Sequence, residues 1–267
     1  MPFIERNGTR IHWEEDGAGT PLLLIMGLKY SSRMWHAALP SHAAEHRVIT
    51  FDNQGTGQSG TRRRTTIAEM THDALAVLDA AGVDTAHVYG VSMGGGIAME
   101  LALQAPERVR SLILGCTTIK TEVTKPPPAL AVALLKAMPW WLQARMSRRS
   151  YGKAATPEAI EHDLAHMKAE VFDWAGVEAQ ARAVAEYTAD RSRVAAFDIP
   201  TLVVHGTSDK LVPYAKGQEI AATIPGARLV TIDDAGHNYF VAGGARVNDA
   251  TLAFLAGVDQ AVHESAR

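Results

Sequence analysis

A single serine between glycines carries the strongest chemical signal in this sequence. Ser92 lies within Gly90-Val91-Ser92-Met93-Gly94, directly after a mostly apolar run and directly before a helix-like segment. A strand that enters a helix through so tight a turn holds its middle residue in strain with the side chain exposed, and bulky residues do not fit at the two glycines. A serine presented in this way can act as a nucleophile when a histidine and a carboxylate reach it.

Two residues further along the chain supply these partners, in the order serine, aspartate, histidine. Asp209 follows an apolar run at 202–204, and His237 follows another at 229–232. All three residues come directly after predicted parallel strands, whose carboxyl ends meet at one edge of an open α/β sheet. In such a triad the histidine takes the serine proton and the carboxylate orients the imidazole. The sequence therefore predicts Ser92, Asp209 and His237 as catalytic residues.

Each of these residues also has a structural interpretation. Serine is a good helix cap, aspartate is common in turns, and a loop histidine can simply contact solvent. Asp233 and Asp234 are rival carboxylates, but they lie too near His237 in sequence to approach its ring comfortably. The glycines that flank Ser92 and the presence of both partners favour the catalytic interpretation.

Short apolar runs alternate with helical patterns along most of the chain. The alternating pattern at 9–15 predicts a half-buried edge strand, and unbroken apolar runs predict buried parallel strands. The clearest helix covers 66–81, where Thr66 and Glu69 form a capping box. Buried strands are predicted at 22–25, 48–51, 87–91, 112–114, 202–204 and 229–232. This alternation predicts an α/β fold with a mostly parallel central sheet and helices on both faces.

The alternation breaks between residues 119 and 197. Three prolines at 126–128 precede helical stretches rich in Met, Trp and Leu, and no strand pattern appears before residue 202. We interpret 119–197 as a helical cap inserted into one core domain, which comprises residues 1–118 and 198–267. The apolar residues of this stretch fit a lid over a pocket, although ordinary helix packing explains most of them equally well.

Composition limits the partners and the location. Of the 267 residues, 47% are hydrophobic and 21% charged, and the formal charge of -3 gives no reason to expect nucleic acid as a partner. Cys116 is the only cysteine, which excludes an internal disulfide and fits a reducing compartment. The N-terminal residues lack a secretory pattern, and no apolar run reaches the length of a membrane span. We therefore expect a cytoplasmic protein with no membrane partner, while its oligomeric state does not follow from the sequence.

Together these motifs resemble the α/β-hydrolase fold superfamily, of the serine esterase and lactonase type. The resemblance covers nearly the whole chain and rests on the strand and turn at 22–28, the segment Asp52-Asn53-Gln54-Gly55-Thr56-Gly57-Gln58-Ser59, the Ser92 turn, His205-Gly206 before Asp209, and Gly236-His237.

The resemblance implies an oxyanion hole formed by two backbone N–H groups. One belongs to Met93, which follows the nucleophile, and the family pattern places the other at Leu28. Met26 departs from the usual histidine, and Asn53-Gln54 stands where the family usually carries an arginine. The donor is a backbone group, so we expect catalysis to survive the change at Met26, with altered polarity near the acyl group. The sequence does not show what replaces the contacts of the arginine.

The resemblance extends to carboxylesterases of small esters, enol-lactonases and acyl-homoserine lactonases. It implies two-step acyl transfer on a small-molecule ester or lactone, without a cofactor. The cap and the residues beside His237 are candidates for an apolar acyl pocket. The predicted substrate-binding residues are Met26, Met138, Trp140, Trp141, Met146, Tyr239 and Phe240.

Two other functions stay open at this point. A cofactor-free perhydrolase, of the kind called bacterial haloperoxidases, resembles this layout and shares its triad. A ligand receptor built on a hydrolase scaffold is the second alternative. Epoxide hydrolases and dehalogenases are disfavoured, because they carry a carboxylate at the position of Ser92.

Two motifs point to other chemistry but lack its context. A glycine pattern at 55–60 matches a dinucleotide fingerprint, but residues 61–65 separate it from the next helix and the required acidic residue is absent. His162 and His166, one helical turn apart, resemble a zinc-binding pair, but no third ligand is apparent nearby. We therefore expect neither a nucleotide nor a metal.

Overall fold

A sheet of eight strands forms the centre of the structure, a computed structural model that describes residues 2–120 and 128–265. The strand order is β1-β2-β4-β3-β5-β6-β7-β8. β1 pairs antiparallel with β2 and β2 with β4, and the remaining neighbours are parallel, so the predicted mostly parallel α/β sheet is confirmed. The strands are β1 (Phe3–Arg6), β2 (Thr9–Asp16), β3 (Pro21–Ile25), β4 (Arg47–Phe51), β5 (Ala86–Val91), β6 (Val109–Gly115), β7 (Thr201–Gly206) and β8 (Arg228–Ile232).

The edge of the sheet differs from the prediction. β1, which the sequence patterns do not predict, pairs with β2 across the turn at Asn7 and Gly8, where φ is 50° and 69°. Two consecutive left-handed residues of this kind are typical of a tight hairpin turn. β2 therefore lies between β1 and β4, and its prediction as an edge strand is wrong. β1 has only four residues and none of them is buried, so it leaves no apolar run to recognise.

Helices connect the strands and cover both faces of the sheet. The predicted capping box is confirmed at the start of α2, where Thr66 Oγ1 accepts from the Glu69 N–H at 3.1 Å and Glu69 Oε2 accepts from the Thr66 N–H at 2.9 Å. Within the described ranges, no helix is both apolar and long enough to cross a bilayer. The helices outside the stretch from β6 to β7 are η1 (Ser32–Ala37), α1 (Leu39–Ala43), α2 (Ile67–Ala80), α3 (Met93–Gln104), η2 (Pro106–Arg108), α9 (Tyr214–Thr223), α10 (Tyr239–Ala242) and α11 (Ala245–Ser265).

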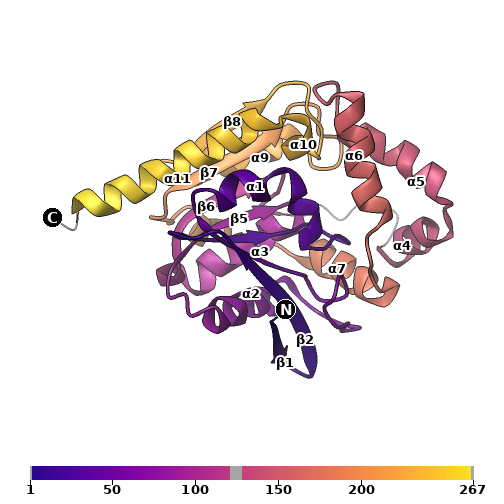
Figure 1. Ribbon diagram of the computed structural model, residues 1–267, viewed down its shortest axis with the longest axis horizontal. Coiled ribbons are helices and arrows are strands. Elements are labelled where there is room, and N and C mark those ends of the chain that lie inside the picture. Colours follow the sequence, from indigo (N-terminus) through magenta and orange to yellow (C-terminus); the bar gives the residue numbers. More distant parts are fainter. Residues whose placement is uncertain (1, 121–127, 266–267) are drawn as a thin grey trace.

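The described residues between β6 and β7 form mainly helices. Figure 1 shows α4, α5 and α6 grouped at one side of the molecule, opposite the free end of α11. We call residues 119–197 the cap; its boundaries stay a prediction, and Pro126 and Pro127 lie outside the described residues. The helices of the cap are α4 (Pro128–Ala137), α5 (Trp140–Ser147), η3 (Arg148–Ser150), α6 (Pro157–Lys168), α7 (Trp174–Glu186) and α8 (Arg191–Val194).

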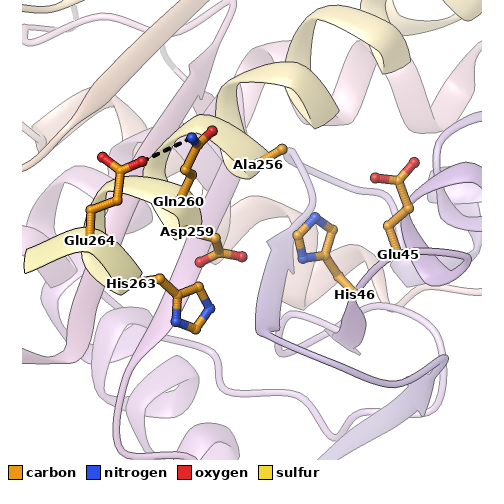
Figure 2. Close-up of a pocket in the computed structure, with 7 residues that line it drawn as sticks. All are labelled: Glu45, His46, Ala256, Asp259, Gln260, His263 and Glu264. Atoms are coloured by element: carbon orange, nitrogen blue, oxygen red, sulfur yellow. Dashed lines mark hydrogen bonds between the residues drawn. The ribbon is translucent and has the colours of Figure 1, made fainter. Parts of the chain in front are cut away.

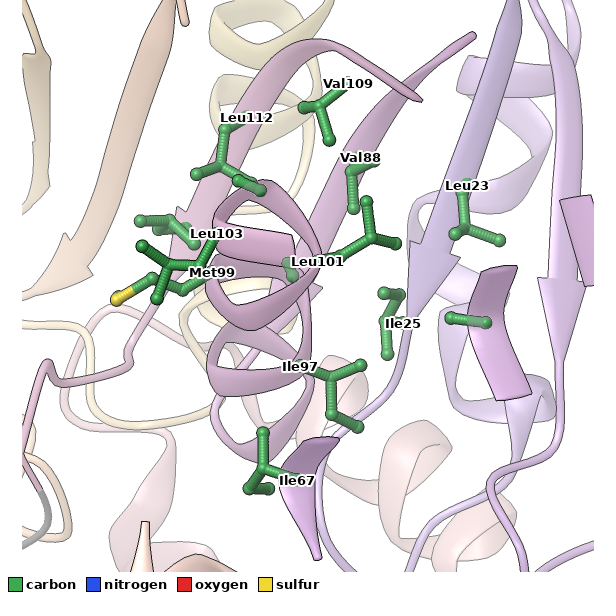
Figure 3. Close-up of a cluster of buried hydrophobic side chains, with 14 of the residues drawn as sticks. Leu23, Ile25, Ile67, Val88, Ile97, Met99, Leu101, Leu103, Val109 and Leu112 are labelled. Carbon is green, nitrogen blue, oxygen red and sulfur yellow. The ribbon is translucent and has the colours of Figure 1, made fainter. Parts of the chain in front are cut away.

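The two faces of the sheet bury two hydrophobic clusters. In β3, Leu23 and Ile25 belong to one cluster, whereas Leu22 and Leu24 belong to the other. Alternate side chains of a strand point to opposite faces, so an unbroken apolar run is what a strand covered on both sides requires. Figure 3 shows the first cluster, in which α3 places Ile97 close to the strand residues. This packing holds the ends of β5 to β8 in a fixed row.

Candidate active site

Ser92 occupies a strained turn between β5 and α3. Its backbone is left-handed, with φ 57° and ψ -119°, a conformation that a residue other than glycine adopts at a penalty of about 1–3 kcal/mol. A Cβ atom at Gly90 would overlap the carbonyl oxygen of Gly94, and one at Gly94 would overlap the carbonyl oxygen of Ile25. Both glycines are therefore required by the close approach of strand and helix, as the sequence pattern predicts.

The side chain of Ser92 is not used to cap α3. Its hydroxyl makes no capping hydrogen bond, although Ser92 directly precedes the helix. Backbone contacts hold the residue instead: its N–H donates to the carbonyl of Gly115 at 2.8 Å, and its own carbonyl accepts from Thr117 Oγ1 at 2.8 Å and from the Gly95 N–H at 3.0 Å. The serine is half-buried, and its hydroxyl does not cap the helix.

Asp209 and His237 form the expected histidine–carboxylate pair. His237 Nδ1 donates to Asp209 Oδ2 at 2.8 Å, and the other carboxylate oxygen accepts from the N–H groups of Leu211 and Val212 at 2.8 and 2.9 Å. Burial raises the pKa of Asp209, but hydrogen bonds from His205, His237 and Val212 outweigh it and hold that pKa well below its usual value. Asp209 is therefore ionised at neutral pH and fixes the orientation of the imidazole.

Four neighbouring strand ends bring the site together. Ser92, Cys116, Asp209 and His237 follow β5, β6, β7 and β8, which are consecutive in the sheet. Ligand atoms of Cys116, Asp209 and His237 all lie within 4.8 Å of one another. Cys116 directly follows Gly115, whose carbonyl accepts from Ser92, so the pair lies beside the serine turn. Burial raises the pKa of the Cys116 thiol well above its usual value, so this group stays neutral.

The turn after β3 lies against the serine. A Cβ atom at Gly27 would be 3.3 Å from the carbonyl oxygen of Val91 and 3.9 Å from Ser92 Oγ. Leu28 follows this glycine directly, and Met93 is the first residue of α3, where N–H groups at the helix N-terminus favour negative charge. Both predicted oxyanion donors thus belong to segments that meet at Ser92, while their role as donors stays a prediction.

Polar contacts link Asn53 and Gln54, which follow Asp52, to the neighbouring turn and to the cap. Asn53 Nδ2 donates to the carbonyl of Met26 at 2.9 Å. Gln180, on α7 of the cap, donates through Nε2 to the carbonyl of Gln54 and accepts through Oε1 from the Lys29 N–H, both at 2.8 Å. These bonds join the turns after β3 and β4 to each other and to the cap. They hold the segment that carries Leu28.

A cap segment also fixes the loop that carries His237. The Gly236 N–H donates to the carbonyl of Tyr151 at 3.0 Å, and the Asn238 N–H donates to that of Ser150 at 2.8 Å. A Cβ atom at Gly236 would overlap the carbonyl oxygen of Ser150, which explains the glycine before the histidine. The cap therefore helps to position the candidate base through its backbone.

The predicted substrate-binding residues differ widely in exposure. Met26, Tyr239 and Phe240 are buried, Met138 and Trp140 are partly exposed, and Trp141 and Met146 are 66% and 50% exposed. The hydroxyl of Tyr239 lies 2.7 Å from that of Tyr89, so Tyr239 packs as a core residue. The exposure of Trp141 and Met146 lends no support to a closed pocket wall at those positions, and the substrate contacts of this set stay predictions.

Sequence reasoning missed Thr117 and Cys116 as parts of the site. The segment at 115–118 contains no carboxylate, so a search for a triad carboxylate does not single it out. Its position after a buried strand, next to the strand of Ser92, was the available signal. Thr117 bonds the serine carbonyl, and Cys116 Sγ lies within 4.8 Å of a ligand atom of Asp209 and of His237.

A surface hollow lies at the other end of the parallel strands. Figure 2 shows its wall, in which Gln260 and Glu264 of α11 share a hydrogen bond of 3.0 Å. His46 directly precedes β4, and Asp259 pairs with His87 near the start of β5. The hollow is lined by Glu45, His46, Ala256, Asp259, Gln260, His263 and Glu264. It is therefore separate from the row of carboxyl ends that holds Ser92.

Comparisons with known proteins agree with this fold. The family model described as the α/β-hydrolase fold matches residues 20–156, and one described as TAP-like protein matches residues 160–260. A protein of Azorhizobium caulinodans named as a carbamate hydrolase, RutD, is 32% identical and the match covers 97% of this chain and 100% of the relative. A protein of Mycobacterium tuberculosis named as a non-heme bromoperoxidase, BpoC, is 30% identical, with 92% and 97% covered.

A solved structure extends the comparison to an esterase. The thermophilic esterase of Thermogutta terrifontis is 26% identical and superposes with a TM-score of 0.83, covering 96% of this chain and 97% of that one. The matched family model spans the serine turn, and the relatives align over nearly the full chain. This chain belongs to the α/β-hydrolase family and is an enzyme of the hydrolase class.

Proposed function

We propose that this hydrolase cleaves carboxylic ester bonds through an acyl-enzyme on Ser92, with lactones as a second substrate class. The observation that carries the proposal is the position of Ser92. Its backbone is strained, its hydroxyl does not cap α3, and it follows a strand in the same row as those that precede the hydrogen-bonded Asp209 and His237. A buried carboxylate that orients an imidazole within reach of a serine hydroxyl is the arrangement that activates serine for acyl transfer.

In the proposed reaction, His237 Nε2 accepts the proton of Ser92 while Oγ attacks the ester carbonyl. The N–H groups of Leu28 and Met93 stabilise the negative charge that develops on the carbonyl oxygen. His237 then gives the proton to the departing alcohol, which leaves an acyl group on Ser92. Water repeats the sequence and releases the acid. Asp209 keeps the ring in the reactive tautomer and stabilises its charged form.

The similar proteins support acyl chemistry and widen the set of candidate substrates. The esterase of Thermogutta terrifontis acts on the bond class proposed here. The relative named as a carbamate hydrolase points to a related carbonyl, which carries both oxygen and nitrogen. Carbamates, which the sequence patterns did not bring to attention, therefore join esters and lactones as substrates to test.

Perhydrolysis is the second candidate, because the relative BpoC is named as a non-heme bromoperoxidase. In this reaction hydrogen peroxide replaces water in the second step and attacks the acyl group on Ser92. The products are a peracid and free serine. The same residues would serve ester hydrolysis and perhydrolysis. The two reactions differ in how readily hydrogen peroxide, rather than water, attacks the acyl group on Ser92.

The decisive experiment compares wild type with Ser92→Ala on p-nitrophenyl esters, a γ-lactone and an aryl carbamate. We expect the substitution to lower kcat/KM on the ester by at least about 10⁴-fold, because the nucleophile is lost. Ser111→Ala is the matched control, because this serine bonds His87 but is fully buried in β6. An aryl phosphonate should label Ser92 alone, as read by peptide mass.

Two results would contradict the proposal. One is a folded Ser92→Ala variant that keeps wild-type turnover, and the other is a phosphonate adduct on a different residue. Peracid formation that outpaces ester hydrolysis in the presence of hydrogen peroxide would favour the second candidate instead.

A further inference from the structure

Three histidine rings from the core and the cap meet where η1 faces α6. His162 and His166 lie one turn apart on α6, and His36 lies on η1. One ring nitrogen from each histidine lies within 4.8 Å of the other two. The ring centroids are 4.0 Å apart for His36 and His166 and 4.8 Å apart for His162 and His166. The sequence shows only the pair on α6, and folding supplies the third ring.

We propose that His36, His162 and His166 bind a divalent transition-metal ion such as Zn²⁺, Co²⁺ or Ni²⁺. Imidazole nitrogens suit these ions, whereas Mg²⁺ and Ca²⁺ prefer oxygen ligands. Three protein nitrogens leave a fourth tetrahedral position for water. His162 is exposed and the other two rings are partly exposed, so an ion can reach the site from solvent. This proposal departs from the expectation of no metal that the sequence patterns give.

A buried carboxylate prepares one of the three rings for a metal. Asp163 is fully buried, and its Oδ1 accepts from His36 Nε2 at 2.7 Å. Its Oδ2 accepts from the hydroxyl of Tyr151 at 2.6 Å and from Asn238 Nδ2 at 3.4 Å. Metal-binding histidines commonly donate their other ring N–H to a carboxylate, which fixes tautomer and orientation. With Nε2–H held in this way, Nδ1 of His36 keeps its lone pair for a metal.

The remaining requirement is a short movement of the rings. Tetrahedral zinc places its nitrogen ligands about 3.3 Å apart, so the rings must draw together slightly. His36 and His166 stack within 10° of parallel. A metal lies in the plane of each ring that it binds, so one of these two rings must turn.

The site would fasten the cap to the core. α6 belongs to the cap, whereas η1 is anchored in the core by Trp35, which is fully buried with its ring centroid 5.0 Å from that of Tyr89. An ion held by both elements binds the folded chain and not the unfolded one. Such an ion raises the thermal stability, and the increase grows with the logarithm of the ion concentration once that concentration exceeds the Kd. The inference concerns this junction alone and does not depend on the proposed ester chemistry.

The test uses metal-free full-length protein, prepared with a chelator and titrated with Zn²⁺ by calorimetry and with Co²⁺ by visible absorption. Wild type should bind one ion per chain and show the absorption of tetrahedral Co²⁺. His162→Ala and His166→Ala should each weaken binding by at least about tenfold, since even the loss of an outer partner of a metal ligand has that effect. Zinc should raise the Tm of wild type but not of these variants.

His72→Ala is the matched control, because His72 is an exposed histidine on α2. It should bind zinc as wild type does. Wild-type affinity in both His162→Ala and His166→Ala would overturn the proposal. Cys116, Asp209 and His237 also bring ligand atoms within 4.8 Å of one another. Zinc that still binds to both variants and blocks ester hydrolysis would therefore place the ion at that second group, and would also overturn the proposal. His162 is exposed, so its substitution should leave the fold intact.

Discussion

Serine, histidine and aspartate side chains occur together at both ends of the parallel strands. The candidate active site lies at the carboxyl ends. At the amino ends, Ser111 Oγ lies 2.7 Å from His87 Nδ1, and His87 Nε2 lies 3.1 Å from Asp259 Oδ1. Because the carboxylate accepts from Nε2–H, Nδ1 is left to accept from the serine hydroxyl. The two sets share their residue types and a hydrogen bond between the histidine and the carboxylate.

The two sets differ in the exposure and the backbone conformation of the serine. Ser111 lies within β6 and is 0% exposed, so no substrate can approach it. Ser92 has a left-handed backbone, is half-buried, and adjoins the first N–H groups of α3. Burial, opposed in part by Asp259, lowers the pKa of His87 to about 4, which suits a neutral core residue. Access, backbone strain and nearby N–H donors therefore distinguish a candidate nucleophile from a packed serine.

The largest expected difference between the two ends of the strands appears when the carboxylate of each set is replaced by an amide. Asp209→Asn should lower kcat/KM for ester hydrolysis by about 10³–10⁴-fold, because the amide no longer holds the reactive tautomer or stabilises the charged imidazole. Asp259→Asn should leave hydrolysis close to wild type. Steady-state kinetics on a p-nitrophenyl ester measures both, and similar losses in the two variants would erase the contrast between the ends.

The next effect concerns the backbone at the serine turn. Gly94→Ala should lower the free energy of unfolding by about 3 kcal/mol or more, because the new Cβ atom overlaps the Ile25 carbonyl and forces strand and helix apart. Gly257→Ala in α11 is the control, since a Cβ atom there meets nothing within 4 Å. It should stabilise the protein by about 0.5–1 kcal/mol. Urea unfolding compares the two, and a fully stable Gly94→Ala variant would contradict the tight packing.

The buried histidine at the amino ends should appear in the pH dependence of stability. His87 has a pKa of about 4 when folded and the usual 6.5 when unfolded, so the unfolded chain takes up the proton first. Its stabilising contribution is thus complete above pH 6.5 and is lost as the pH falls toward 4. Between about pH 7 and about pH 4.5, wild type should lose about 2 kcal/mol more than His87→Gln. Equal losses in urea unfolding would mean that His87 is not held neutral.

The smallest effect concerns one hydroxyl at each end. Thr117→Val removes the hydrogen bond to the Ser92 carbonyl and should lower kcat/KM about fivefold, equivalent to about 1 kcal/mol. Thr201→Val removes a similar bond, from Thr201 Oγ1 to the Ile199 carbonyl at 2.8 Å, at the start of β7. Both variants should lose similar stability, but only Thr117→Val should slow hydrolysis. Slower hydrolysis in both would show that the effect is not local to Ser92.

Much of the fold follows from local patterns in the chain. Apolar runs predict the buried strands, because a strand covered on both faces needs apolar side chains on each. The capping box at Thr66 and Glu69 predicts the start of α2, because its two hydrogen bonds form within one turn. The glycines around Ser92 predict the serine turn for a similarly local steric reason. β1 escapes this reasoning, because four residues without burial carry no such pattern.

Local patterns in the chain suffice to predict the buried strands, the serine turn and the order of the residues that follow those strands, since each depends on backbone sterics or on which side chains avoid water. Contacts between groups far apart in the chain come from the folded structure. Asn53 reaches the carbonyl of Met26, and His36 meets Asp163 across 127 positions of the chain. Such contacts depend on how the cap and the loops fold back against the sheet, and patterns among neighbouring residues do not predict that arrangement.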